Sequence, residues 1–154
     1  MRKIAIIMGS ESDKPVVEEA LPFLEYFGIQ PELFVRSAHR TPELVQEFAT
    51  NAEKNKFEVI IACAGMAAHL PGVVAAFTKL PVIGVPLEAG PLKGQDALYS
   101  IVQMPAGVPV ATMAIGKAGV RNAAIFAAQI IARYDDQVSG NLEAFKQNKC
   151  RIPG

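Results

Sequence analysis

The sequence predicts an α/β fold of three layers, in which a parallel sheet of five strands carries helices on both faces. Five short runs rich in β-branched residues alternate with segments of helical periodicity, as in parallel sheets joined by right-handed crossovers. The runs lack polar residues at alternate positions, which is typical of strands covered on both faces. The length of 154 residues fits one domain, which we place at residues 1–154.

The first strand is predicted at residues 3–8 (KIAIIM), and a helix follows it. Ser12 or Asp13 can cap this helix, whose apolar residues recur at helical spacing as far as Gly28. Pro22 lies inside the helical pattern and removes one backbone donor, so we expect either a kink or a late helix start.

The later elements continue the alternation, and five strands favour a flavodoxin-like arrangement. The strands are predicted at residues 31–35, 59–63, 82–85 and 110–114, and the helices at residues 42–52, 70–77, 96–103, 118–134 and 136–150. Thr41 is the natural cap of the second helix. The helix at 118–134 has small or apolar residues on almost every face and needs burial all round, so we expect it to contact another subunit. We also expect the helix at 136–150 to take part in oligomer contacts.

The composition favours an oligomer with a small-molecule partner. Hydrophobic residues make up 51% of the chain and charged residues 19%, which leaves few polar side chains to cover a small globule. Some apolar surface is therefore expected between subunits. Fifteen basic and fifteen acidic side chains cancel, so the chain lacks the positive field that non-specific nucleic acid binding requires.

Cysteine usage and hydropathy favour a cytoplasmic protein. Cys63 and Cys150 form no Cys-x-x-Cys motif, so neither a disulfide framework nor a zinc cluster is predicted. The apolar run near the N-terminus is too short for a signal peptide. The most apolar region, residues 59–77, is interrupted by His69 and Pro71, so we expect no membrane segment.

Three unusual loops follow the first three strands, at the edge of the sheet where doubly wound folds bind ligands. They comprise residues 9–13, 37–40 and 64–69. The first offers the hydroxyls of Ser10 and Ser12 and the donors of a helix N-terminus, which suit a phosphate, although a plain helix cap has the same composition. Asp13 suits a ribose diol or capping, because a carboxylate repels phosphate. The motifs typical of ATP and NAD sites are absent, so neither cofactor is implied.

The second loop, within FVRSAHRTPELV, carries His39 and Arg40. A histidine can give and take a proton near neutral pH, and an arginine can hold phosphate or carboxylate through its planar guanidinium. The alternative is a histidine whose ring nitrogens bond loop carbonyls. The place of His39 at the ligand edge favours a role in chemistry.

The third loop and a later one are less specific. Small residues at 64–68 allow a ligand to approach closely, or else they pack strand against helix. His69 is predicted to cap or brace the helix that begins at Leu70. With two histidines and no carboxylate at ligand spacing, no metal site is predicted. The loop at 87–94 (LEAGPLKG) is either a mobile lid or a plain surface connection.

Six segments occur in an order and spacing that resemble the class I N5-carboxyaminoimidazole ribonucleotide mutase family of de novo purine biosynthesis. They are GSESD, SAHRTP, AAHLPG, PVIGVP, SIVQMPAGVPVAT and NAAIFAAQI, and they cover roughly residues 4–134. A sister group carboxylates aminoimidazole ribonucleotide directly with carbon dioxide, typically has lysine after the loop histidine and lacks AAHLPG. Arg40 and the segment at 69–72 place this chain with the mutases.

The resemblance implies a flavodoxin-like subunit of a cytoplasmic homo-octamer, with sites at subunit junctions and neither a metal nor an organic cofactor. It implies that His39 is the general acid and base, that Arg40 and the serines hold a phosphate, and that Asp13 holds ribose hydroxyls. The candidates for substrate binding are Ser10, Ser12, Asp13, Ser37, Arg40, Gly65, Ala67, His69 and Leu70.

The implied reaction moves a carboxylate from an exocyclic nitrogen to ring carbon four of a ribonucleotide. The hypothesis is that His39 protonates the departing nitrogen, that residues 64–68 hold the carbon dioxide released, and that His39 then removes the proton from carbon four. Two alternatives stay open, namely a non-catalytic nucleotide-binding or assembly module of the same fold and a carboxylase that uses carbon dioxide directly. Relatives commonly have glycine where this chain has Met66, and Lys14 and the loop at 87–94 also depart from the family pattern.

Overall fold

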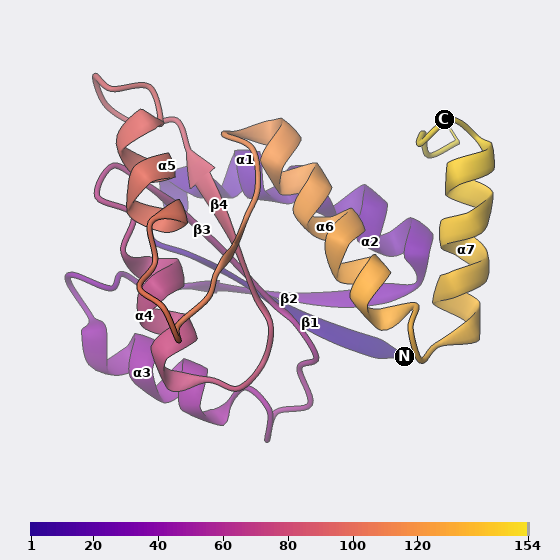
Figure 1. Ribbon diagram of the computed structural model, residues 1–154, viewed down its shortest axis with the longest axis horizontal. Helices are drawn as coiled ribbons and strands as arrows, with labels where there is room; N and C mark the ends of the chain where they lie inside the picture. The colour runs from indigo at the N-terminus through magenta and orange to yellow at the C-terminus, as the bar shows by residue number, and fades with distance from the viewer. Residues whose placement is uncertain (154) are drawn as a thin grey trace.

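The chain forms one parallel sheet with the strand order β2-β1-β3-β4-β5 in the computed structural model, which describes residues 1–153 (Figure 1). The strands are β1 (Arg2–Met8), β2 (Ile29–Val35), β3 (Ile60–Gly65), β4 (Val82–Leu87) and β5 (Ala111–Thr112). In the sheet, β2 lies on one side of β1, and β3, β4 and β5 follow in turn on the other side. This reversal beside β1 is the switch point of the flavodoxin-like order, so the predicted fold class is confirmed.

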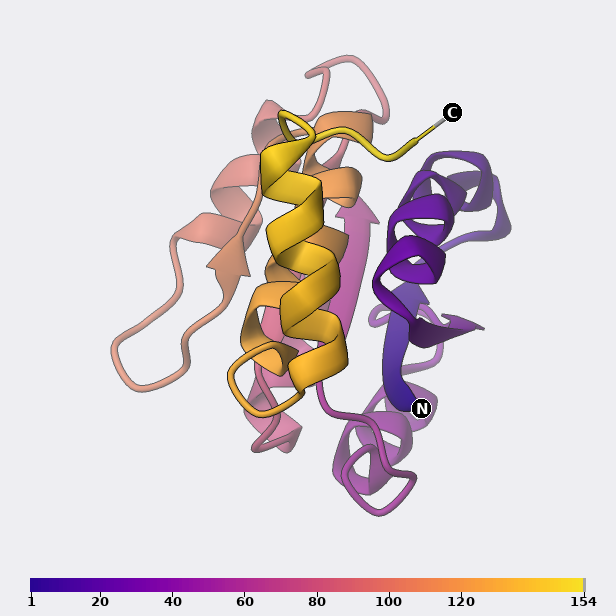
Figure 2. The same ribbon diagram turned by 90° about the vertical axis from the view of Figure 1, so that its right-hand side faces the viewer.

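Helices cover both faces of the sheet and complete the three layers (Figures 1 and 2). One face carries α3 (Pro42–Asn51), α4 (Leu70–Phe77) and α5 (Gln95–Val102), and the other carries α1 (Lys14–Val17), α2 (Leu21–Phe27) and α6 (Lys117–Ile131). The last helix, α7 (Asp136–Gln147), packs outside α2 and α6. In the described part of the chain, no helix combines the length and apolar character needed to cross a membrane.

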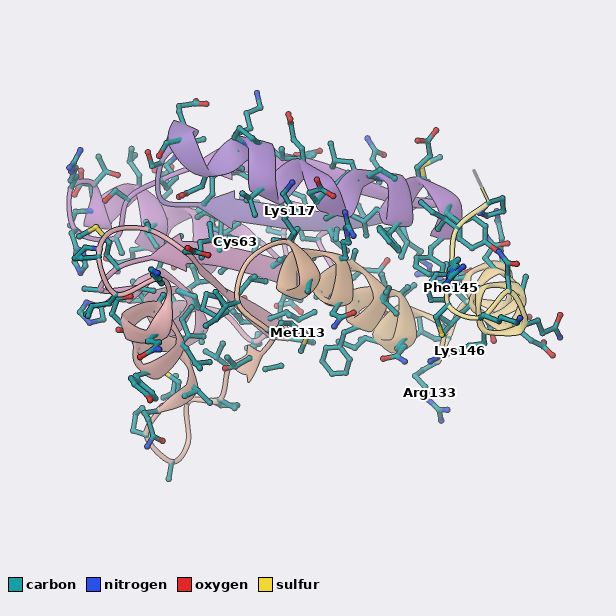
Figure 3. The ribbon with its side chains drawn as sticks, turned by 90° about the horizontal axis from the view of Figure 1, so that it is seen from above. Cys63, Met113, Lys117, Arg133, Phe145 and Lys146 are labelled. Atoms are coloured by element: carbon teal, nitrogen blue, oxygen red, sulfur yellow. The ribbon has the colours of Figure 1, made fainter. Side chains whose placement is uncertain are left out.

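Successive residues of the central strands enter different hydrophobic cores. In β1, Ile6 belongs to the core beneath α2 and α6, whereas Ile7 belongs to the core beneath α3 and α4. Both side chains are fully buried, which explains why the strand sequence has no polar alternation. Phe145, labelled on α7 in Figure 3, extends the first core. Its ring meets the ring of Phe27 edge-on, with 5.3 Å between ring centroids.

The region after β1 has the late helix start expected from Pro22. It consists of a 3-10 turn (Glu11–Asp13), α1, a second 3-10 turn (Glu18–Ala20) and α2. Pro22 lies in the first turn of α2, where its missing N–H costs no hydrogen bond. Asp13 occupies the N-cap position of α1, which was one of the two predictions, but neither Ser12 nor Asp13 makes a side-chain cap hydrogen bond. Instead the first turn begins earlier, and Ser10 Oγ accepts a hydrogen bond from the N–H of Ser12 at 3.3 Å.

The fifth strand is shorter than the predicted residues 110–114. Only Ala111 and Thr112 form the paired strand beside β4. Beyond them the chain turns toward α6, and the N–H of Gly116 bonds the carbonyl of Pro86 at 2.9 Å. The N–H of Met113 also donates to the carbonyl of Gly84 at 2.9 Å, so the chain continues beside β4 through separate hydrogen bonds although the assigned strand ends at Thr112.

Within the single chain, α6 is covered by the sheet, α2 and α7. Its buried residues are Gly119, Val120, Ala123, Ala124, Ala127, Ala128 and Ile131. They pack against the sheet and α2, while α7 covers another side. The outward face carries exposed Arg121 and Asn122, together with partly buried Ile125 and Phe126. The chain itself therefore supplies most of the cover, and a subunit contact of α6 stays a prediction.

An ion pair fixes the start of α7 to the first strand. Arg2 Nε lies 2.7 Å from Asp135 Oδ2, and Asp135 Oδ1 accepts a hydrogen bond from the N–H of Val138 at 2.9 Å. The Arg2 guanidinium and the N–H of Val138 hold the pKa of Asp135 below its usual range. The stability that this carboxylate contributes is therefore present at neutral pH and is lost as the pH falls through the lowered pKa.

Two helical glycines provide a matched test of packing around α6. A Cβ at Gly119 would overlap the carbonyl oxygen of Ala114, whereas a Cβ at Gly140 on α7 would meet nothing within 4 Å. We expect Gly119→Ala to lower the free energy of unfolding by about 1–3 kcal/mol, because backbone must move to admit the methyl group. We expect Gly140→Ala to raise it by about 0.5–1 kcal/mol, because alanine loses less conformational entropy in a helix. Denaturant unfolding measures both, and a loss of stability in both variants would contradict this account.

Candidate active site

One cleft of about 510 Å³ at the carboxyl edge of the sheet gathers every residue predicted for the site. These residues are Ser10, Ser12, Asp13, Ser37, His39, Arg40, Gly65, Ala67, His69 and Leu70. They come from the loops after β1, β2 and β3, which are neighbours in the sheet. Ligands of doubly wound folds bind at such a switch point, because the crossovers on its two sides lead away in opposite directions.

The loop after β1 presents two hydroxyls and one carboxylate to the cleft. Ser10 Oγ lies 2.9 Å from Ser12 Oγ, and both serines are exposed. Asp13 is half-buried, and the loss of solvent raises the pKa of its carboxyl group, while a hydrogen bond with the backbone of Ser10 opposes the shift. The protein thus keeps a carboxylate at the cleft at some cost to its own stability.

The loop after β2 is held in shape by Ser37 and Thr41. The N–H of Thr41 donates to the carbonyl of Ser37 at 2.9 Å, and the Thr41 hydroxyl donates to the same oxygen at 3.1 Å. Ser37 Oγ accepts a hydrogen bond from the N–H of Arg40 at 3.2 Å. Thr41 occupies the N-cap position of α3, as predicted, but its side chain makes no cap hydrogen bond. Its hydroxyl instead stabilises the turn that exposes His39 and Arg40.

A short hydrogen bond joins the only two histidines of the chain, which lie 30 residues apart in the sequence. His39 Nε2 lies 2.7 Å from His69 Nδ1, and the two rings are nearly perpendicular at 89°. His69 occupies the N-cap position of α4, as predicted, but its ring makes no cap hydrogen bond and is bonded to His39 instead. One facing nitrogen must donate while the other accepts. Both rings therefore cannot carry a proton on the facing nitrogens at once.

The loop after β3 is narrow because another loop lies against it. A Cβ at Gly65 would come within 2.8 Å of the Ala89 side chain, so only glycine fits there without movement. Ala89 lines the cleft and was not predicted, although its loop at 87–94 was singled out as a lid or connection. Nothing in the sequence distinguishes this alanine from the many others in the chain.

Among the described residues, neither a cluster of metal ligands nor a reactive thiol is found at the cleft. Within residues 1–153, no group of three or more His, Cys, Asp or Glu side chains is placed to hold a metal ion. Cys63 lies at the end of β3 but is fully buried, and burial raises the pKa of its thiol, which leaves it unreactive.

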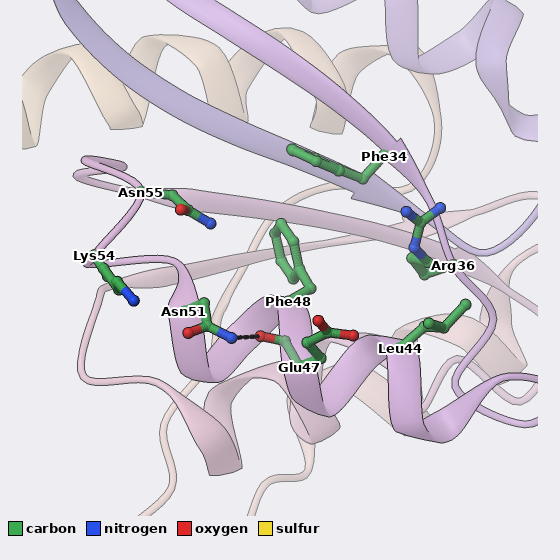
Figure 4. A pocket seen from close by; sticks show the side chains of 8 residues that line it. All are labelled: Phe34, Arg36, Leu44, Glu47, Phe48, Asn51, Lys54 and Asn55. Carbon is green, nitrogen blue, oxygen red and sulfur yellow. Dashed lines mark hydrogen bonds between the residues drawn. The ribbon is translucent and has the colours of Figure 1, made fainter.

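A second hollow, of about 450 Å³, lies between α3 and β2 (Figure 4). It is lined by Phe34, Arg36, Leu44, Glu47, Phe48, Asn51, Lys54 and Asn55. Asn51 Nδ2 donates to the backbone carbonyl of Glu47 at 2.9 Å, so this side chain makes a hydrogen bond within α3. None of the predicted site residues lines this hollow.

Comparisons with known proteins identify the family and the fold of the chain. Residues 3–151 match the protein family described as AIR carboxylase. The N5-carboxyaminoimidazole ribonucleotide mutase of Haemophilus influenzae is 52% identical over 150 residues, which are 97% of this chain and 92% of that protein. The enzyme of the same name from Thermotoga maritima is 52% identical over 151 residues, which are 98% of this chain and 87% of that protein. The crystal structure of Treponema denticola PurE superposes with a TM-score of 0.87 at 29% identity, covering 97% of this chain and 92% of that one.

Two carboxylates with opposite pKa shifts provide a test of the electrostatics. We expect Asp13→Asn to raise the melting temperature at neutral pH, because burial penalises the charged form of Asp13. The gain should shrink as the pH falls through the raised pKa and vanish below about pH 4, the usual range of an aspartate. Thermal denaturation across this pH range is the measurement.

Asp135→Asn is the matched control. The same chemical change should lower the melting temperature at neutral pH, because the pKa of Asp135 is held down by Arg2. If both substitutions changed the melting temperature in the same direction at neutral pH, the opposite pKa shifts of Asp13 and Asp135 would be contradicted.

Proposed function

Since the chain belongs to the AIR carboxylase family, we propose that it converts N5-carboxyaminoimidazole ribonucleotide to 4-carboxy-5-aminoimidazole ribonucleotide in de novo purine (IMP) biosynthesis. The observation that carries this proposal is the 52% identity with mutases over nearly the full length of both chains. The conversion is an isomerisation, because substrate and product differ only in the atom that bears the carboxylate. The chain is accordingly an isomerase.

The loops after β1 and β2 supply the groups that an anionic ribonucleotide requires. The paired hydroxyls of Ser10 and Ser12 and the guanidinium of Arg40 bind the phosphate, since all are exposed at the cleft and can donate hydrogen bonds. The carboxylate of Asp13 accepts hydrogen bonds from the ribose hydroxyls. Ser37 lies beside them and, through its bond to the N–H of Arg40, fixes the loop that carries the guanidinium.

His39 is the general acid and base of the reaction. It donates a proton to the exocyclic nitrogen as the bond from nitrogen to the carboxyl carbon breaks, which releases carbon dioxide and leaves aminoimidazole ribonucleotide with an uncharged amino group. Ring carbon four then attacks the carbon dioxide, and His39 recovers its proton from that carbon. The proton given in the first step is taken back in the last, so the cycle needs no other proton carrier.

The bond to His69 prepares His39 for this role. Because His39 Nε2 is engaged by His69 Nδ1 at 2.7 Å, the other ring nitrogen of His39, Nδ1, is the one available to the substrate. The same bond limits rotation of the ring. Orientation of this kind lowers the entropy cost of the proton transfers.

The small residues of the third loop hold the carbon dioxide between the two steps. Gly65 and Ala67 leave room beside the histidine pair, and Leu70 adds an apolar wall. Carbon dioxide is uncharged, so a pocket of small apolar groups holds it near carbon four without strong polar contacts. Proximity of this kind accounts for a large share of the rate.

The test supplies the carbamate substrate without ATP or added bicarbonate and measures the carbon-carboxylated product. We expect turnover by the pure protein, and a fall of about 10²–10⁴-fold in kcat for His39→Asn with substrate binding retained. Aminoimidazole ribonucleotide with bicarbonate is the comparison substrate. Faster turnover of that pair would favour a direct carboxylase, and no turnover of either substrate would favour a non-catalytic module.

The second part of the proposal is a homo-octamer that works in the cytoplasm. Two exposed apolar side chains on α5, Tyr99 and Val102, are 64% and 47% accessible in the single chain, which supports burial against a second copy. Two free cysteines, Cys63 and Cys150, support a reducing compartment. Light scattering should give the mass of eight copies of the 16.5 kDa chain. A monomer at the concentration of the assay would refute the octamer.

A further inference from the structure

Met66 has an unusual conformation for a residue with a large side chain. It adopts the left-handed backbone region at φ 55°, which is unfavourable for any residue with a Cβ atom. Its side chain is apolar and yet 54% exposed. Five residues other than glycine have a positive φ within residues 1–153, and among them Met66 alone lines the cleft. Backbone strain that is kept at the rim of a functional cleft points to a role there.

The Met66 side chain, at the edge of the cleft, packs against the loop at 87–94, which follows the neighbouring strand β4. A Cβ built at Gly90 would lie 3.6 Å from Met66 Cε and 3.8 Å from Sδ, so the thioether lies along the turn at Gly90. A Cβ built at Gly65 would likewise lie 2.8 Å from the Cβ of the adjacent Ala89. The loops after β3 and β4 therefore make two neighbouring contacts, Gly65 with Ala89 and Met66 with Gly90.

We propose that Met66 is the apolar cover of the carbon dioxide pocket, which it closes against the turn at Gly90 between the two halves of the reaction. This inference rests on the proposed function. A cover that retains carbon dioxide must be apolar and able to move. The methionine side chain meets both needs, because its thioether has almost no hydrogen-bonding capacity and its three rotatable bonds let it swing aside for the substrate.

The cover acts on the fate of carbon dioxide rather than on its release from nitrogen. When the pocket stays closed, carbon four attacks the carbon dioxide and the carboxylated product forms. When it opens, carbon dioxide diffuses into the solvent and aminoimidazole ribonucleotide is left behind. Met66 therefore determines the ratio of released to transferred carbon dioxide.

Three substitutions separate the side chain from the strained backbone. Met66→Leu keeps an apolar side chain of similar size, Met66→Ala keeps a Cβ at positive φ but removes the cover, and Met66→Gly removes the cover and the strain together. Leu92→Ala is the matched control. Leu92 lies on the loop at 87–94, its apolar side chain is 58% exposed, and it does not line the cleft. Circular dichroism verifies that each variant is folded.

The measurement uses substrate labelled with ¹³C at the carbamate carbon, in buffer with an excess of unlabelled bicarbonate. Released label is diluted, so the fraction of label found in the carboxylated product reports transfer. Loss of an apolar contact in a pocket changes discrimination about tenfold, so the ratio of released to transferred label should rise by about that factor in Met66→Ala and Met66→Gly. It should stay near the wild-type ratio in Met66→Leu and Leu92→Ala.

Two results would overturn the inference. A wild-type ratio in both Met66→Ala and Met66→Gly would mean that the side chain does not retain carbon dioxide. A changed ratio in Met66→Gly with a wild-type ratio in Met66→Ala would assign the effect to the backbone. Failure of the wild-type protein to form any carboxylated product would instead overturn the proposed function, which keeps the two failures distinguishable.

Discussion

The site depends on one constraint, the parallel register that makes three adjacent strands end at the same level. Met8 is paired with Val35 of β2 on one side and with Cys63 of β3 on the other. Each of these residues is at or near the end of its strand, so the three following loops start side by side. The reversal of strand order beside β1 leaves the space between them open as a cleft. The two serines of the first loop, the histidine pair and the small residues after β3 thus meet at one cleft, although they come from three separate loops.

The hydrogen bond between the two histidines is the most specific product of this arrangement. It joins the loop after β2 to the loop after β3, although β1 lies between these strands in the sheet. The loops must therefore extend over the end of β1, and the turn built by Ser37 and Thr41 brings His39 to the right place. In this way hydrogen bonds within one loop help to place the ring of His39 at the cleft.

The cleft also concentrates features that lower the stability of the fold. Asp13 is a carboxylate that burial destabilises, and Met66 is a large residue in a backbone conformation that favours glycine. Elsewhere local preferences agree with the structure, as at Gly28, whose φ of 74° ends α2. Local conflicts of this kind are expected at functional positions, where binding and catalysis require groups that folding alone would not select.

The sequence alone determined the fold class and the edge at which the site lies, because strand periodicity and glycine-rich loops depend on residues that are close in the chain. It also identified His39, Arg40 and the small-residue loop as candidates. Only the tertiary structure brought His69 to His39 and Ala89 to Gly65, because these contacts depend on the order and register of strands far apart in the sequence. The cover of α6 by α2 and α7 was likewise decided by long-range packing. Local chemistry therefore predicts which residues can act, and the sheet decides which of them act together.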